Sequence, residues 1–142
     1  MVGVVSFSPG NCSISMAEYA SSFSVLILPA RSALSPLLTG GTEGVGLRQP
    51  RQEVTCRLIS ALGFPVTGTS ANRAGKPPFT RAGEVEREFG NDLALILDSG
   101  PCPGGLPSTI VDVSVSPPRL LRAGAVAIPD VRKIVTELVF ER

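Results

Sequence analysis

The chain of 142 residues contains no histidine, and this absence excludes several common catalytic designs. Ser-His and Cys-His catalysis in their usual forms need an imidazole base, and histidine-ligated metal sites need an imidazole ligand. The three cysteines, Cys12, Cys56 and Cys102, form no C-x-x-C pair, so neither a zinc knuckle nor a redox motif is present. An odd number of widely spaced cysteines is consistent with reduced thiols in a cytosol.

Long apolar runs are also missing. The longest, around residues 25–28, is far too short to cross a bilayer and suits a buried strand. The N-terminal stretch MVGVVSF lacks the basic n-region and the small-residue cleavage site of a signal peptide. We therefore expect a cytoplasmic protein without a membrane partner.

The charges nearly balance, with a formal net charge of +1, and only Lys76 and Lys133 among the 13 basic residues are lysines. So small a net charge excludes a strong general field for nucleic acid, although it leaves room for a local basic groove. The predominance of arginine suits bidentate recognition of carboxylate or phosphate groups. A GC-rich genome would produce the same bias.

Hydrophobic residues make up 43% of the chain and the mean hydropathy is +0.27, which indicates one globular domain over residues 1–142. Short apolar runs predict strands at 2–7, 25–28, 45–48, 65–69, 93–97, 109–115 and 120–121. Helical patterns lie at 15–23, at 52–62, at 80–89 with Thr80 as its cap, and at 130–139 with Asp130 as its cap. Several connections between strands are too short for crossover helices, so we predict an α/β fold with an open, twisted mixed sheet flanked by helices.

The stretch PVTGTSANRAGKPP, residues 65–78, looks at first like a phosphate-binding P-loop. A P-loop requires G-x-x-x-x-G-K-[ST], whose first glycine lets backbone N–H groups surround a phosphate. Here Ser70 takes the place of that glycine, and Lys76 is followed by Pro77, which has neither a hydroxyl nor an N–H group. The cluster of Thr67, Thr69, Ser70 and Asn72 in this stretch therefore needs another role.

Polar clusters follow or precede four of the predicted strands. They are Arg48 at a strand end, TSAN at 69–72, PST at 107–109 and LRAG at 121–124. If the sheet brings these ends together, the site has two guanidinium groups, several hydroxyls and an amide, with no obvious general base. This composition suits the binding of an anionic substrate and the positioning of phosphates.

Each residue also has an ordinary structural interpretation when it is taken alone. Arg48 and Arg122 could be surface charges beside carboxylates. Ser70 and Asn72 could cap a turn, because both residue types bond readily to nearby backbone. Ser108 could belong to an ordinary strand edge.

The joint pattern resembles the YrdC-like family, the threonylcarbamoyl-AMP synthases. The similar stretches are LTGGTEGVGLRQP, PVTGTSANRAGKPP, ALILDSGPCPGGLPSTIVDV and RLLRAGAV, and the resemblance runs from about residue 25 to about residue 128. The motifs T-S-A-N, P-S-T-[IV]-V-D and L-R-x-G in this order are its specific part.

The resemblance implies an enzyme that joins L-threonine, bicarbonate (or carbon dioxide) and ATP, with Mg²⁺ accompanying the ATP. The products are threonylcarbamoyl-AMP and pyrophosphate, and partner proteins then transfer the threonylcarbamoyl group to an adenosine of tRNA. By the same resemblance, Arg48 and Ser108 would bind threonine, whereas Ser70, Asn72 and Arg122 would bind the nucleotide. No catalytic residue and no metal ligand is assigned.

Residues 1–24 depart from the family pattern. Members normally carry a P-T-x-T-x-Y-G-L stretch and then a K-x-R segment there, and this sequence has neither. Either the sequence starts inside a longer gene, or it is a divergent member. The alternative function is therefore a catalytically inactive YrdC-like module that binds a nucleotide or RNA, such as tRNA or double-stranded RNA. A related carbamoyl-transfer domain of hydrogenase maturation proteins would share the fold.

Overall fold

A computed structural model describes residues 4–6, 24–102 and 106–140, and the chain divides into two compact units. The first, here called the sheet unit, comprises Met1–Gly68 and Leu106–Arg142. The second, here called the loop unit, comprises Thr69–Gly105. The assignment of residues 1–142 to a single YrdC-like domain stays a prediction.

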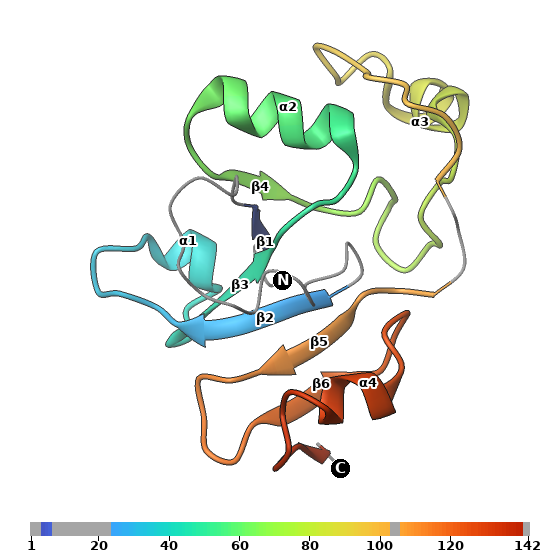
Figure 1. The fold of residues 1–142 in the computed structure, drawn as a ribbon. Coiled ribbons are helices and arrows are strands. Elements are labelled where there is room, and N and C mark those ends of the chain that lie inside the picture. The colour runs from blue at the N-terminus through green and yellow to red at the C-terminus, as the bar shows by residue number, and fades with distance from the viewer. Residues whose placement is uncertain (1–3, 7–23, 103–105, 141–142) are drawn as a thin grey trace. The chain divides into compact units, whose positions relative to one another are not determined.

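The sheet unit contains an open mixed sheet with the strand order β4-β1-β3-β2-β5-β6-β7 (Figure 1). Parallel pairs are β1–β3, β2–β5 and β6–β7, and the remaining neighbours are antiparallel. The strands are β1 (Val4–Ser6), β2 (Ser24–Pro29), β3 (Gly44–Arg48), β4 (Val66–Gly68), β5 (Thr109–Asp112), β6 (Arg119–Arg122) and β7 (Val139–Phe140). The predicted α/β fold with an open mixed sheet is confirmed.

Four helices are present in the described ranges: α1 (Pro36–Thr39), α2 (Glu53–Leu62), α3 (Ala82–Phe89) and α4 (Ile128–Arg132). The predicted helix at 52–62 is confirmed as α2. The Gln52 side chain accepts the N–H of Thr55 at 2.7 Å, and Gly63 ends the helix with φ +71°, a conformation that glycine adopts without steric cost. Over these same ranges, no helix has the length and apolar character to span a bilayer.

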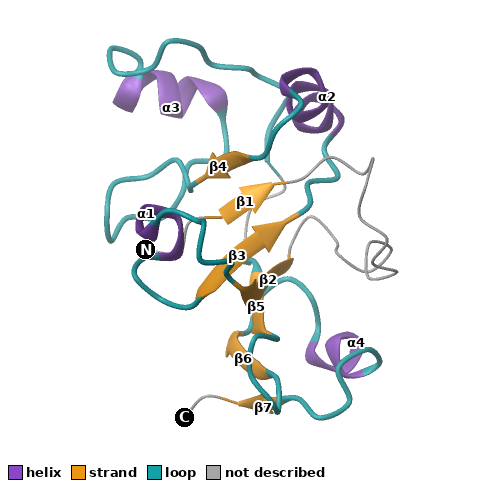
Figure 2. Cartoon of the chain, turned by 90° about the vertical axis from the view of Figure 1, so that its left-hand side faces the viewer, coloured by secondary structure: helices purple, strands orange, loops and turns teal. Residues whose placement is uncertain are grey.

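Strands β5 and β6 and helix α4 lie at the same end of the sheet unit (Figure 2), and they share a cluster of buried apolar side chains. Val111 comes from β5, Leu120 from β6 and Val131 from α4, and Leu138 precedes β7. The four side chains are 2–8% exposed. This cluster fixes β5 and β6, the two strands whose ends carry the PST and LRAG motifs.

The prediction for the C-terminal segment is wrong in its extent. Helix α4 begins at Ile128 and ends at Arg132, with Ala127 rather than Asp130 as its N-cap. Val139 and Phe140 form β7, which pairs in parallel with β6. The apolar spacing from residue 131 onward fits a helix, but the β-branched and aromatic residues at its end gain a sheet edge instead.

Two predictions in the loop unit are also wrong. Residues 93–97 form no strand, and Leu95 is 71% exposed, because this run has no strand to pair with inside its own unit as described. Thr80 is not the cap of α3. The carboxylate of Glu84 instead accepts the N–H groups of Thr80 at 3.1 Å and of Arg81 at 3.0 Å, and Arg81 is the N-cap.

The remaining boundaries differ for local reasons. The strand predicted at 109–115 ends at Asp112, because this carboxylate turns back to accept the N–H and the hydroxyl of Ser114. The predicted strand at 2–7 is present as β1 within the described residues 4–6. The helix predicted at 15–23 lies outside the described residues.

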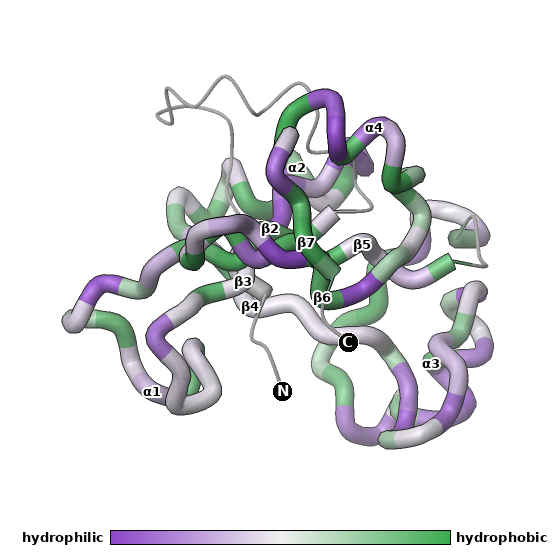
Figure 3. The backbone as a smooth tube through the Cα atoms, turned by 90° about the horizontal axis from the view of Figure 1, so that it is seen from below, coloured by the Kyte–Doolittle hydropathy of each residue, from purple (hydrophilic) through white to green (hydrophobic). Residues whose placement is uncertain are grey.

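Figure 3 shows hydrophilic residues, drawn purple, along much of α3, in keeping with its lack of buried side chains.

Candidate substrate-binding site

The topology of the sheet brings three predicted site residues to one edge. Strand β3 runs antiparallel to β2, which is parallel to β5, and β5 is antiparallel to β6. The carboxyl ends of β3 and β6 and the start of β5 therefore lie at the same edge. Arg48 ends β3, Ser108 immediately precedes β5, and Arg122 ends β6.

Register places the two arginines at nearly the same level across the sheet. Leu47 of β3 pairs with Leu26, and Ile110 of β5 pairs with both Val25 and Arg122. Arg48 follows Leu47 directly, so its row of the sheet is that of Val25. Arg48 and Arg122 therefore lie in one row of the sheet, with β2 and β5 between them.

Arg48 is half-buried, and this burial lowers the pKa of its guanidinium group. The group nevertheless remains charged at neutral pH, because the pKa of arginine lies so high. Partial removal from water strengthens its attraction to a carboxylate ligand. These properties suit the proposed role of holding the carboxylate of an amino acid.

Ser108 and Arg122 form one structural module. The Nε of Arg122 donates a hydrogen bond to the carbonyl oxygen of Ser108 at 2.9 Å. The N–H of Ala125 donates to the carbonyl oxygen of Pro107 at 2.9 Å. The PST and LRAG motifs, which are well separated in the sequence, are therefore in direct contact, and Nε anchors the Arg122 side chain beside Ser108.

Thr109 stabilises this module through a buried side chain. Its side chain is 0% exposed, and its hydroxyl donates to the carbonyl oxygen of Val126 at 3.1 Å while accepting the N–H of Val126 at 3.0 Å. The P-S-T motif by itself does not predict that Thr109 is a positioning residue. The signal is the pairing of P-S-T with L-R-x-G, because each motif supplies the partners of the other.

We expect Thr109→Val to destabilise the protein by about 1–3 kcal/mol, because it leaves both polar groups of Val126 without their partner. Thr109→Ser is the matched control. It keeps the hydroxyl and loses one methyl group, which costs about 1 kcal/mol. Urea unfolding of the three proteins measures the difference, and a valine variant no less stable than the serine variant would contradict the stabilising role.

The loop unit holds Ser70 and Asn72. The Asn72 amide group donates to the carbonyl oxygens of Arg73 at 3.0 Å and of Lys76 at 2.8 Å, so it closes the turn that follows the TSAN motif. Its Oδ1 atom is buried and has no hydrogen-bond partner. The turn-forming interpretation of Asn72 therefore has direct support, and its nucleotide-binding role stays a prediction.

The neighbours of Ser70 use their own groups to shape the loop. Thr69 donates its hydroxyl to the carbonyl oxygen of Ser70 at 3.0 Å, and the N–H of Asn72 donates to the same oxygen at 3.0 Å. Ser70 is exposed. Ser70 is therefore an exposed residue whose carbonyl oxygen accepts two hydrogen bonds from within the loop.

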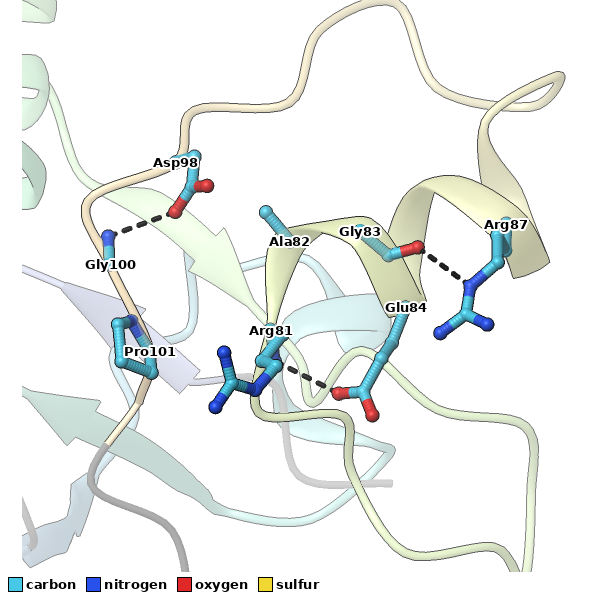
Figure 4. Close-up of a pocket in the computed structure, with 8 residues that line it drawn as sticks. All are labelled: Arg81, Ala82, Gly83, Glu84, Arg87, Asp98, Gly100 and Pro101. Atoms are coloured by element: carbon cyan, nitrogen blue, oxygen red, sulfur yellow. Dashed lines mark hydrogen bonds between the residues drawn. The ribbon is translucent and has the colours of Figure 1, made fainter.

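A hollow of about 270 Å³ lies at the start of α3 in the loop unit (Figure 4). Arg81, Glu84 and Arg87 line it from the helix, and Asp98 and Gly100 line it from the later segment. Both carboxylates are engaged with backbone, because Glu84 caps the helix and Asp98 accepts the N–H of Gly100 at 2.9 Å. Two positive and two negative side chains balance here, so the hollow has no preference for an anion.

A family model for Sua5, YciO and YrdC proteins, described as "Telomere recombination", matches residues 7–124. The chain belongs to the Sua5/YciO/YrdC family. The threonylcarbamoyl-AMP synthase of Pyrococcus abyssi is 34% identical over 113 residues, which are 80% of this chain and 33% of that protein. The threonylcarbamoyl-AMP synthase of Bacillus subtilis is 36% identical over 111 residues, or 78% and 32% of the two chains.

Solved structures agree with this membership. The crystal structure of Pyrococcus abyssi Sua5 complexed with L-threonine superposes with a TM-score of 0.83 at 26% identity, covering 99% of this chain and 45% of that one. Measured against the two curated synthases above, the chain spans about a third of their length. The resemblance that the motifs predicted is confirmed.

Proposed function

We propose that the chain forms threonylcarbamoyl-AMP from L-threonine, bicarbonate and ATP. The observation that carries this proposal is the arrival of Arg48, Ser108 and Arg122 at one edge of the sheet in a member of the Sua5/YciO/YrdC family. The complex of Pyrococcus abyssi Sua5 with L-threonine supports threonine as the amino acid.

Each residue has a role that follows from its chemistry. The guanidinium of Arg48 binds the carboxylate of threonine, and Ser108 offers a hydroxyl to the same substrate. Arg122, held at Ser108 through Nε, directs its remaining N–H donors to the nucleotide. Ser70 contacts the phosphates of ATP, and Asn72 keeps the Ser70 loop closed.

The bond changes follow from the proposed product. Threonine and bicarbonate form a carbamate with loss of water, and a carbamate oxygen bonds to the α-phosphorus of ATP. The bond from that phosphorus to the bridging oxygen of the β-phosphate breaks, and pyrophosphate leaves. The contribution of the protein is orientation and charge stabilisation, because the described site offers cations and hydroxyls and no general base.

The described residues contain no group of three Cys, Asp or Glu side chains that could hold a metal ion. A magnesium ion on ATP needs only one or two protein ligands beside the phosphates. We therefore propose that Mg²⁺ arrives with ATP. The downstream partners would be tRNA and the proteins that transfer the threonylcarbamoyl group to it, which also makes the cytoplasm the expected location.

Pyrophosphate release from MgATP tests the proposal. We expect release only when L-threonine and bicarbonate are both present, and none from an ATP analogue whose α–β bridge is a methylene group. Release without threonine would contradict the proposed reaction. No release from protein shown to be folded would also contradict it and would favour the inactive binding module.

A further inference from the structure

We propose that Arg73 is a positioning residue that holds the loop of residues 70–79 in place through the last turn of α3. This inference deepens the proposed function and rests on it for the identity of the ligand, a nucleotide phosphate at Ser70. The observations that carry it all lie inside the loop unit.

Arg73 makes two contacts with adjacent residues of α3. Its Nε atom forms an ion pair with Oε1 of Glu88, and its guanidinium carbon lies 5.4 Å from the ring centroid of Phe89. A carboxylate and an aromatic face together fix the planar guanidinium group in orientation as well as in position.

The returning arm of the loop meets the same ring. Phe79 and Phe89 pack edge to face, with ring centroids 6.4 Å apart and an interplanar angle of 67°. The N–H of Phe79 donates to the carbonyl oxygen of Ala71 at 3.3 Å. Both arms of the loop are thus anchored on Phe89. Ser70–Asn72 directly precedes the Arg73 anchor, and the bond from Phe79 to Ala71 ties it to the returning arm.

Because these groups are exposed, their contacts affect the order of the loop more than the stability of the whole protein. The Arg73 side chain is 65% exposed and that of Glu88 is 35% exposed. Solvent weakens such an ion pair, and a cation–π contact at an exposed site is modest, so each is worth about two- to five-fold in an equilibrium constant. Loss of Arg73 should therefore loosen the loop without unfolding the protein.

Arg73→Ala is expected to raise amide hydrogen exchange in residues 70–79 about ten-fold, while the melting temperature falls by no more than about 5 °C. The dissociation constant for ATP should rise by less, about two- to five-fold, because affinity follows the fraction of closed loop. The KM for threonine should not change. Arg73→Lys keeps a cation over Phe89 without the planar fork, so its exchange rate and its dissociation constant for ATP should lie between those of the wild type and of Arg73→Ala.

Arg57→Ala is the matched control, because it removes another exposed arginine that pairs with a glutamate, Glu53 at 2.7 Å on α2. It should leave exchange in residues 70–79 and ATP binding unchanged. Unchanged exchange in Arg73→Ala would overturn the proposal, and so would equal losses of threonine and ATP affinity. If the wild-type chain binds no ATP, the proposed function fails, and the exchange measurement still decides whether Arg73 orders the loop.

Discussion

Arg48→Ala is expected to weaken threonine binding about 30- to 1,000-fold and ATP binding far less. Removing one partner of a hydrogen-bonded, partly desolvated charge pair costs about 2–4 kcal/mol. The half-buried guanidinium at the end of β3 is such a partner if it holds the threonine carboxylate. Steady-state KM values for threonine and for ATP in the pyrophosphate assay measure how differently the substitution affects the two substrates.

Arg48→Lys separates charge from geometry. Lysine keeps the positive charge but cannot form two parallel hydrogen bonds with a carboxylate, so an intermediate loss is expected. Arg57→Ala is again a suitable control, because its exposed pair lies on α2. A similar rise in the KM for threonine and for ATP would contradict the assignment of Arg48 to the amino acid.

The positions of the central strands could be predicted from the sequence, but their order in the sheet could not. The runs at 25–28, 45–48 and 65–69 are apolar, β-rich and bounded by glycine or proline, so local signals agree with one another, and the structure has strands there. Pairing partners were not predictable, because they depend on contacts between residues far apart in the chain. Three such pairings bring Arg48 and Arg122 to one edge.

The errors occurred where local pattern and tertiary context disagree. The run at 93–97 has a strand composition but no partner strand inside the loop unit as described, so composition alone misled. Residues 131–139 fit a helical spacing, yet Val139 pairs with Arg119 of β6. Short apolar runs do not settle such cases, because their spacing fits both structures.

The motifs point to candidate site residues but not to the residues that support them. Ser70, Ser108 and Arg122 are candidates from the motifs, and their roles stay predictions, whereas Arg73 and Thr109 did not stand out in the sequence. The roles of the last two depend on contacts across 15 and 17 residues of sequence, with Glu88 and with Val126. No spacing rule within one motif reveals such partners.

Gly124→Ala is expected to destabilise the protein by about 1–3 kcal/mol or more and to lower its melting temperature by about 3–10 °C. A Cβ atom at position 124 would lie 2.6 Å from the carbonyl carbon of Ser108 and 2.6 Å from the amide nitrogen of Thr109. It would lie closer still to the carbonyl oxygen of Pro107. All three are backbone atoms, so no side-chain rotation relieves the clash.

Gly83→Ala provides the matched control. Gly83 lies in the first turn of α3, and a Cβ atom there would have no neighbour within 4 Å. Alanine is the better helix former and restricts the unfolded chain, so this variant should be unchanged or more stable by about 0.4–1 kcal/mol. Thermal unfolding of the two variants therefore compares the same chemical change with and without a close backbone neighbour.

The consequence of Gly124→Ala extends beyond stability, because the crowded atoms belong to the site. Relief of the clash requires the backbone of residues 107–109 to move away from position 124, which would break the bonds from Ala125 to Pro107 and from Arg122 to Ser108. We therefore expect the folded variant to lose affinity for both threonine and ATP, unlike Arg48→Ala. A variant with wild-type stability and wild-type KM values would show that the PST and LRAG segments do not depend on this close approach.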